Sequence, residues 1–136
     1  MADYLARYKL ADLFLDTFPY GAHTTALDSL KAGVPVLTLL GQSFPGRVAA
    51  SLLNTIGLPE LITKNQEEYE TLAIELANNP GKLVKIKERL EINLIKSPLF
   101  NTPLFAKNIE AVYTKMYEQY QKGLKPEHIS TDLGLG

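Results

Sequence analysis

The 136-residue chain contains no cysteine, which excludes disulfide bonds, thiolate metal sites and cysteine nucleophiles. It also has no excess of positive charge, since 14 Lys and Arg stand against 15 Asp and Glu. Proteins that neutralise the phosphates of nucleic acids or anionic membranes usually carry such an excess. We therefore expect no nucleic-acid or membrane partner, and any anionic ligand must be held by a local site.

Long apolar runs are absent as well. None approaches the roughly 18 residues that span a bilayer, and no basic segment followed by an apolar one opens the chain. We expect a cytoplasmic protein. Because 46% of the residues are hydrophobic, a chain of this length can bury the core of one compact domain.

The first half of the chain alternates between strand and helix patterns. Residues 10–16 (LADLFLD) predict a buried strand, and residues 34–40 (VPVLTLL) predict a parallel strand covered by helices on both faces. Residues 60–63 predict a weak third strand. A helix that begins near His23 lies between the first two strands, and a helix over residues 47–57 lies between the second and the third.

Three helices follow the last strand. Asn65 and Glu68 form a capping pair for a helix that ends at about residue 77, and further helices are predicted over residues 82–95 and 103–121. This order predicts an α/β fold with a short parallel sheet flanked by helices. Three strands are few for a parallel sheet, so we interpret residues 1–123 as the C-terminal half of a larger Rossmann-like domain and residues 124–136 as a disordered tail.

The loop after the first strand is the strongest candidate for a ligand site, since ligands of open parallel sheets bind beyond the carboxyl ends of the strands. It leads into His23, Thr24 and Thr25 at a helix start, where free N–H groups, the helix dipole and two hydroxyls could hold a diphosphate. The competing interpretation is a capping box formed by Thr25 and Asp28 without any ligand, which composition alone favours. If a nucleotide binds, Asp28 is placed to accept hydrogen bonds from the ribose.

Other polar residues give weaker signals. A single loop histidine such as His23 is more often structural than functional. Asp16 ends the predicted first strand and is expected to cap the following loop rather than to bind a metal, because no further ligands lie nearby. No metal or other cofactor is implied.

Longer stretches of the chain resemble the O-linked N-acetylglucosamine transferase family, which includes SPINDLY-like proteins with tetratricopeptide repeats. The resemblance covers most of residues 4–125 and corresponds to the C-terminal end of the catalytic region. It rests on residues 10–28 (LADLFLDTFPYGAHTTALD), 32–38 (AGVPVLT), 47–53 (RVAASLL), 57–62 (GLPELI) and 97–102 (SPLFNT), together with Tyr69.

The resemblance implies a GT-B architecture of two facing Rossmann-like domains. It also implies transfer of N-acetylglucosamine, with inversion and without a metal, from UDP-N-acetylglucosamine to Ser or Thr of proteins. In the family, the motif at His23, Thr24 and Thr25 cradles the diphosphate, and the acid at Asp28 binds the ribose. Arg7 matches a family arginine, whereas Tyr4 stands where histidine is common.

The family's upstream Rossmann-like domain, its tetratricopeptide repeats and its phosphate-binding lysine are not found in these 136 residues. We therefore expect the chain alone to be inactive and to self-associate through an open sheet edge or its last helix. Two alternatives stay open: a non-catalytic scaffold or interaction domain that keeps the fold without binding a donor, and a relative that uses GDP-fucose.

Overall fold

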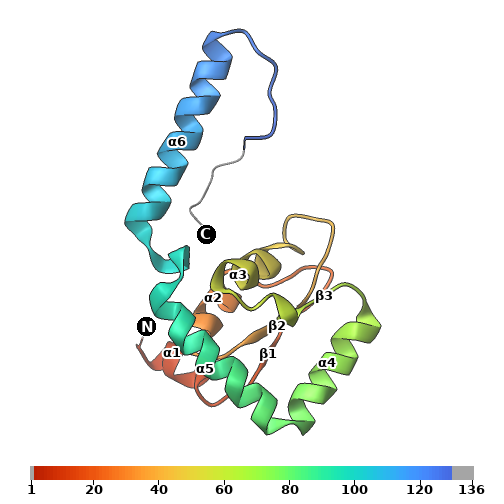
Figure 1. The fold of residues 1–136 in the computed structure, drawn as a ribbon. Coiled ribbons are helices and arrows are strands. Elements are labelled where there is room, and N and C mark those ends of the chain that lie inside the picture. The colour runs from red at the N-terminus through yellow and green to blue at the C-terminus, as the bar shows by residue number, and fades with distance from the viewer. Residues whose placement is uncertain (1, 130–136) are drawn as a thin grey trace. The chain divides into compact units, whose positions relative to one another are not determined.

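The computed structural model describes residues 2–129 and divides between Ser97 and Pro98 into two compact units. The first unit contains the sheet and five helices, and the second contains one long helix (Figure 1). Each unit is described by itself.

The first unit is built on a three-stranded parallel sheet, as predicted. Strands β1 (Phe14–Leu15), β2 (Val36–Leu39) and β3 (Ile62–Thr63) lie in this order, with Phe14 opposite Val36 and Thr38 opposite Ile62. The prediction of a buried strand over residues 10–16 is wrong in its extent. Only two residues pair with β2, and Leu10 is exposed because it lies before this pairing begins.

Helices cover both faces of the sheet. Helices α2 (Thr24–Lys31) and α3 (Val48–Ile56) contact each other and β2, whereas α4 (Gln66–Asn78) packs on the other face against β2 and β3 (Figure 1). Helix α5 (Pro80–Lys96) packs against α4 and α3. This layered arrangement confirms the predicted α/β class.

Large apolar side chains from all layers form the core. A short 3₁₀ helix, η1 (Pro59–Leu61), leads into β3 and contributes to it. Burial of each such side chain stabilises the fold by about 1.5–3 kcal/mol. The largest fully buried apolar residues are Leu30, Val36, Leu37, Leu53, Ile56, Leu58, Leu61, Leu76 and Leu90.

Helix α1 (Ala2–Tyr8), which was not predicted from the sequence, precedes the sheet and contacts α2. The rings of Tyr4 and Tyr8 meet edge to face on it, and their hydroxyls are 2.9 Å apart. Helix α1 thus lies against α2, the helix that begins at the predicted ligand motif.

The second unit contains η2 (Pro98–Phe100) and α6 (Thr102–Gln121), which begins one residue before the predicted helix. Residues 124–129 form neither helix nor strand, and the rest of the predicted tail lies outside the described residues. The domain boundary at residue 123 stays a prediction. None of the helices over residues 2–129 is long and apolar enough to span a bilayer.

Candidate functional site

The candidate site is the start of α2, which follows β1 through the loop at residues 16–23. His23 is the N-cap residue, Thr24 and Thr25 are the first two helical residues and are exposed, and no side chain caps the first turn. The predicted capping box of Thr25 and Asp28 is therefore wrong. Because the N-cap position is occupied by His23, two residues before Thr25, Thr25 lies inside the first turn and cannot act as its cap.

The His23 ring is held between two aromatic side chains from different loops. It stacks on Tyr20 with ring centres 5.6 Å apart and meets the edge of Phe44 at 5.9 Å. Its Nε2 atom is buried and has no hydrogen-bond partner among the described residues. An unpaired buried polar atom costs roughly 1–3 kcal/mol, so this nitrogen is well suited to a ligand at the helix start.

Tyr20 and Phe44 were not predicted from the sequence to be parts of the site. Both are largely exposed, at 68% and 78%, and both lie in Gly- and Pro-containing loops that follow β1 and β2. Exposed aromatic residues in two loops at the same edge of a sheet were the signal that could have revealed them.

Asp28 lies one turn further along α2 and is half-buried. Its charge reaches α1: the hydrogen bond to Tyr4, burial, and the charges of Tyr4 and Asp28 together raise the pKa of Tyr8 to about 12. Tyr4 is 42% exposed, and Arg7 is exposed in the last turn of α1. The structure therefore places the predicted residues on two helices in contact: His23, Thr24, Thr25 and Asp28 on α2, and Tyr4 and Arg7 on α1.

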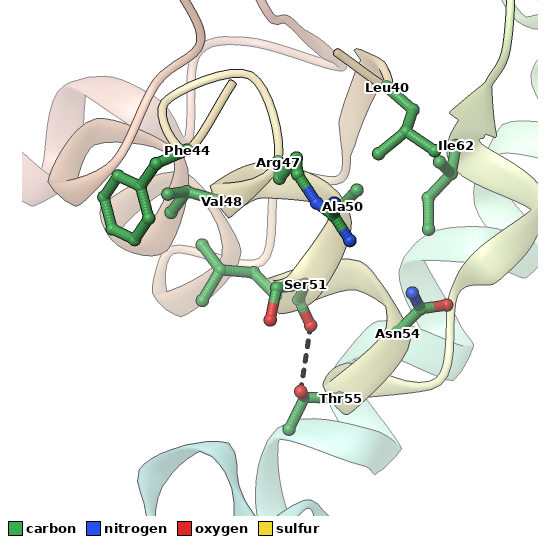
Figure 2. A pocket seen from close by; sticks show the side chains of 10 residues that line it. Leu40, Phe44, Arg47, Val48, Ala50, Ser51, Asn54, Thr55 and Ile62 are labelled. Atoms are coloured by element: carbon green, nitrogen blue, oxygen red, sulfur yellow. Dashed lines mark hydrogen bonds between the residues drawn. The ribbon is translucent and has the colours of Figure 1, made fainter. Parts of the chain in front are cut away.

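A groove of about 690 Å³ lies along α3 beside this site (Figure 2). Phe44 lines it and also touches His23, so the groove adjoins the start of α2. Apolar side chains, including Leu52, line part of the groove, and Arg47, Ser51 and Asn54 supply polar groups. Leu52 on α3 is one of the residues that line this groove, and Ala50 is buried on the same helix.

Asp16 caps the loop after β1, as predicted. Its Oδ1 accepts hydrogen bonds from the backbone N–H groups of Thr17 at 2.9 Å and Ala22 at 2.7 Å. Across residues 2–129, no three His, Asp or Glu side chains are grouped in a way that could hold a metal ion.

A parallel sheet with a helix start and unpaired polar groups at its carboxyl edge is typical of nucleotide-binding α/β enzymes. Residues 2–109 match the profile of glycosyl transferase family 41, and the chain belongs to this family.

Named relatives agree with this assignment. The chain is 40% identical over 124 residues, 91% of its length, to the Arabidopsis thaliana protein described as the probable UDP-N-acetylglucosamine–peptide N-acetylglucosaminyltransferase SPINDLY. It is 39% identical over 128 residues, 93% of its length, to SEC, the similarly described protein of the same plant. The chain spans only 14% and 13% of these two relatives.

A solved structure is also similar. A mutant of the Thermobaculum terrenum O-GlcNAc transferase superimposes with a TM-score of 0.81 at 38% identity. The match covers 86% of this chain and 22% of that protein. The expected resemblance to O-linked N-acetylglucosamine transferases is thus confirmed.

Proposed function

We propose that this chain is the donor-nucleotide half-site of a protein O-glycosyltransferase. The whole enzyme would transfer N-acetylglucosamine, with inversion, from UDP-N-acetylglucosamine to Ser or Thr of proteins. The observation that carries this proposal is the uncapped start of α2, beside which the buried Nε2 of His23 has no partner among the described residues. The names of the relatives, which specify a UDP-sugar donor and a peptide acceptor, support the choice of substrates.

Each residue has a specific role in this proposal. The first-turn N–H groups and the hydroxyls of Thr24 and Thr25 hold the diphosphate, aided by the roughly half positive charge of the helix terminus. Asp28, one turn away from the phosphates, accepts hydrogen bonds from the ribose hydroxyls. Tyr4 and Arg7 on α1 face the nucleobase end of the donor.

The same helix start contributes to the reaction. When the bond between the sugar and UDP breaks, negative charge develops on the diphosphate, and fixed N–H donors aimed at that charge lower the barrier. The acceptor-activating base and the second wall of the cleft come from the upstream domain. Because transfer requires donor and acceptor to be held together, we expect no turnover by these 136 residues alone. Sugar transfer to a peptide by the isolated chain would contradict this expectation.

Calorimetric titration with UDP, uridine and GDP tests the half-site. We expect weak binding by the 136-residue chain, with UDP bound more tightly than uridine because the helix start recognises phosphate. Equal affinities for UDP and uridine would rule out the site. Tighter binding of GDP would favour the GDP-fucose alternative. The absence of nucleotide binding, also in a longer chain that includes an upstream Rossmann-like domain, would favour the scaffold alternative.

Residues 1–123 are, in this proposal, part of a larger domain whose other strands continue the sheet beside β1. Within the described residues β1 pairs only with β2, and Leu15 is 53% exposed. A hollow of about 500 Å³ beside it is lined mainly by apolar side chains such as Leu13, Leu76 and Val84. An open strand edge next to apolar surface favours association with another chain.

The isolated chain should therefore self-associate, which light scattering over a concentration series can measure. Leu15→Lys, which places a charge at the strand edge, should shift the chain toward monomer. Tyr117→Lys on α6 tests the last helix as the other contact surface. A folded wild-type chain that stays monomeric at high concentration would contradict the proposal of a larger domain.

A further inference from the structure

We propose that Asp16 is a positioning residue for the donor site, because its carboxylate fixes the loop at residues 17–22 and thereby the direction in which the start of α2 points. This inference rests on the proposed donor-binding function. It concerns a residue that makes no contact with the donor in that proposal.

The carboxylate of Asp16 bonds to both ends of the loop. Oδ1 accepts the N–H of Thr17 at 2.9 Å, where the loop begins, and the N–H of Ala22 at 2.7 Å, immediately before the N-cap residue His23. The side chain is only 4% exposed, and hydrogen bonds to a carboxylate are stronger than those between neutral groups. The last loop residue before α2 is thus held from the inside.

The other carboxylate oxygen connects Asp16 to the sheet. Oδ2 accepts the hydroxyl of Thr38 at 2.7 Å, and Thr38 is buried in the middle of β2. The hydroxyl of Thr63 on β3 in turn donates to the backbone oxygen of Thr38 at 3.0 Å. Polar contacts therefore run from β3 through β2 to Asp16, and they connect the loop to the buried middle of the sheet.

Contacts from outside hold the same loop. The hydroxyl of Tyr69 on α4 donates to the backbone oxygen of Asp16 at 2.8 Å, and its ring meets the edge of Phe18. A Cβ atom on Gly21 would lie 2.8 Å from the backbone oxygen of Pro45 and 3.1 Å from Oδ2 of Asp16. The loop is therefore packed too closely for any residue larger than glycine at position 21.

This fixation stabilises little apolar core, because residues 17–20 are exposed. Its main effect is on geometry: Tyr20, which belongs to the loop, stacks on His23, and Ala22 sets the backbone that enters α2. Donors that are held in place before the ligand arrives bind charge without paying for reorganisation. Without the hydrogen bonds to Asp16, the loop would be free to move, and the first-turn N–H groups of α2 and His23 would no longer be held in place for the ligand.

The test compares UDP affinity among variants of the 136-residue chain, by calorimetry well below each unfolding midpoint. Asp16→Ala should weaken UDP binding by about tenfold, because donors that are no longer preorganised must be ordered when the ligand binds. Asp16→Asn should recover most of the affinity, because its Oδ1 still accepts from Thr17 and Ala22. Thr38→Val, which removes the bond to β2 but keeps both loop bonds, should weaken UDP binding less than Asp16→Ala does. Asn79→Ala, which removes the cap at the start of α5, is the control: it should lower the unfolding midpoint but leave UDP affinity unchanged.

A second variant tests the inference if Asp16→Ala fails to fold. Gly21→Ala displaces the same loop while the carboxylate stays, and it should also weaken UDP binding. Unchanged UDP affinity in folded Asp16→Ala or in Gly21→Ala would overturn the inference, since it would leave Asp16 with a purely structural role.

Failure of the proposed function is distinguishable from failure of this inference. If neither the wild-type chain nor a longer chain that includes an upstream Rossmann-like domain binds UDP, the donor site is wrong, and amide hydrogen exchange tests the positioning role by itself. Asp16→Ala, or Gly21→Ala in its place, should then speed exchange at residues 22–25 more than at the buried amides of α3. Equal acceleration at both places would overturn the positioning role as well.

Discussion

The helices of this chain begin in two different ways. Asparagine side chains start α4, α5 and α6: Asn65, Asn79 and Asn101 each accept the backbone N–H three residues further on, at 2.8, 3.1 and 3.0 Å. Helix α2 begins at His23 with no side-chain cap. Because a cap of this kind contributes about 0.5–2 kcal/mol, the start of α2 lacks a stabilising contact that three other helices have.

The surroundings of the start of α2 indicate what its missing cap leaves room for. Helix α3, whose N-cap residue is Arg47, also has no side-chain cap, and α2, α3 and the capped helix α4 all follow the carboxyl ends of strands. The start of α2 differs from the others by the buried Nε2 of His23, which has no hydrogen-bond partner among the described residues. We infer that the uncapped first turn of α2 is kept free for a ligand at the edge where parallel sheets bind theirs.

The largest expected effect comes from removing the ribose acceptor next to the uncapped start. In a longer transferase chain that contains these residues, Asp28→Ala should weaken UDP binding by about 1.5–3 kcal/mol, or tenfold and more, because a charged hydrogen bond is lost. The unfolding midpoint should change little, since no cap at the start of α2 depends on Asp28. Calorimetry and thermal unfolding measure the two quantities, and unchanged nucleotide affinity would defeat the ribose role.

The contrast between helix starts also shows which features a sequence can reveal. The pair of Asn65 and Glu68 was predictable, and it is confirmed, because both partners lie within one turn and the Asn65 side chain also donates to Glu68. The capping box at Thr25 was wrong by two residues, because Ser, Thr and Asp are frequent at helix starts whether or not they cap. Local patterns locate a helix better than they locate its first residue.

Contacts between distant residues were not predictable in the same way. Asp16 meets Thr38 and Tyr69, which are 22 and 53 positions away in the chain, so no spacing rule connects them. Sequence reasoning predicted that Asp16 caps its own loop, which is a local contact, but not that the sheet and α4 hold it. Likewise, β1 is short because pairing with β2 begins only at Phe14, and register is a property of two segments.

A smaller effect is expected at a capped start. Asn65→Ala should lower the free energy of unfolding by about 1 kcal/mol, because the N–H of Glu68 loses its partner. Nucleotide affinity should not change, since the side chain of Asn65 bonds to Glu68 within the first turn of its own helix. Asn79→Ala on α5 is a matched variant with the same expected outcome. Denaturant unfolding and UDP titration check both variants, and a parallel loss of affinity would show that capped and uncapped starts do not differ in function.

The smallest expected effect concerns Tyr69. This residue of the capped helix α4 contacts the loop that leads into the uncapped helix α2. Its hydroxyl donates to the backbone oxygen of Asp16, so Tyr69→Phe should lower the free energy of unfolding at about pH 8 by roughly 0.5–1.5 kcal/mol while keeping the ring against Phe18. Burial, aided by the charge of Asp16, raises the pKa of Tyr69 above its ordinary value of 10.0.

A raised pKa in the folded state means that the protonated hydroxyl stabilises the fold fully below about pH 10, and that this contribution is lost as the pH rises through the raised pKa. The gap in stability between wild type and Tyr69→Phe should therefore narrow as the pH rises above 10. Tyr8, whose pKa is about 12, titrates in both proteins and cancels from the difference. Urea unfolding of both proteins at several pH values measures the gap, and a constant gap up to pH 11 would show that the Tyr69 hydroxyl does not hold the loop.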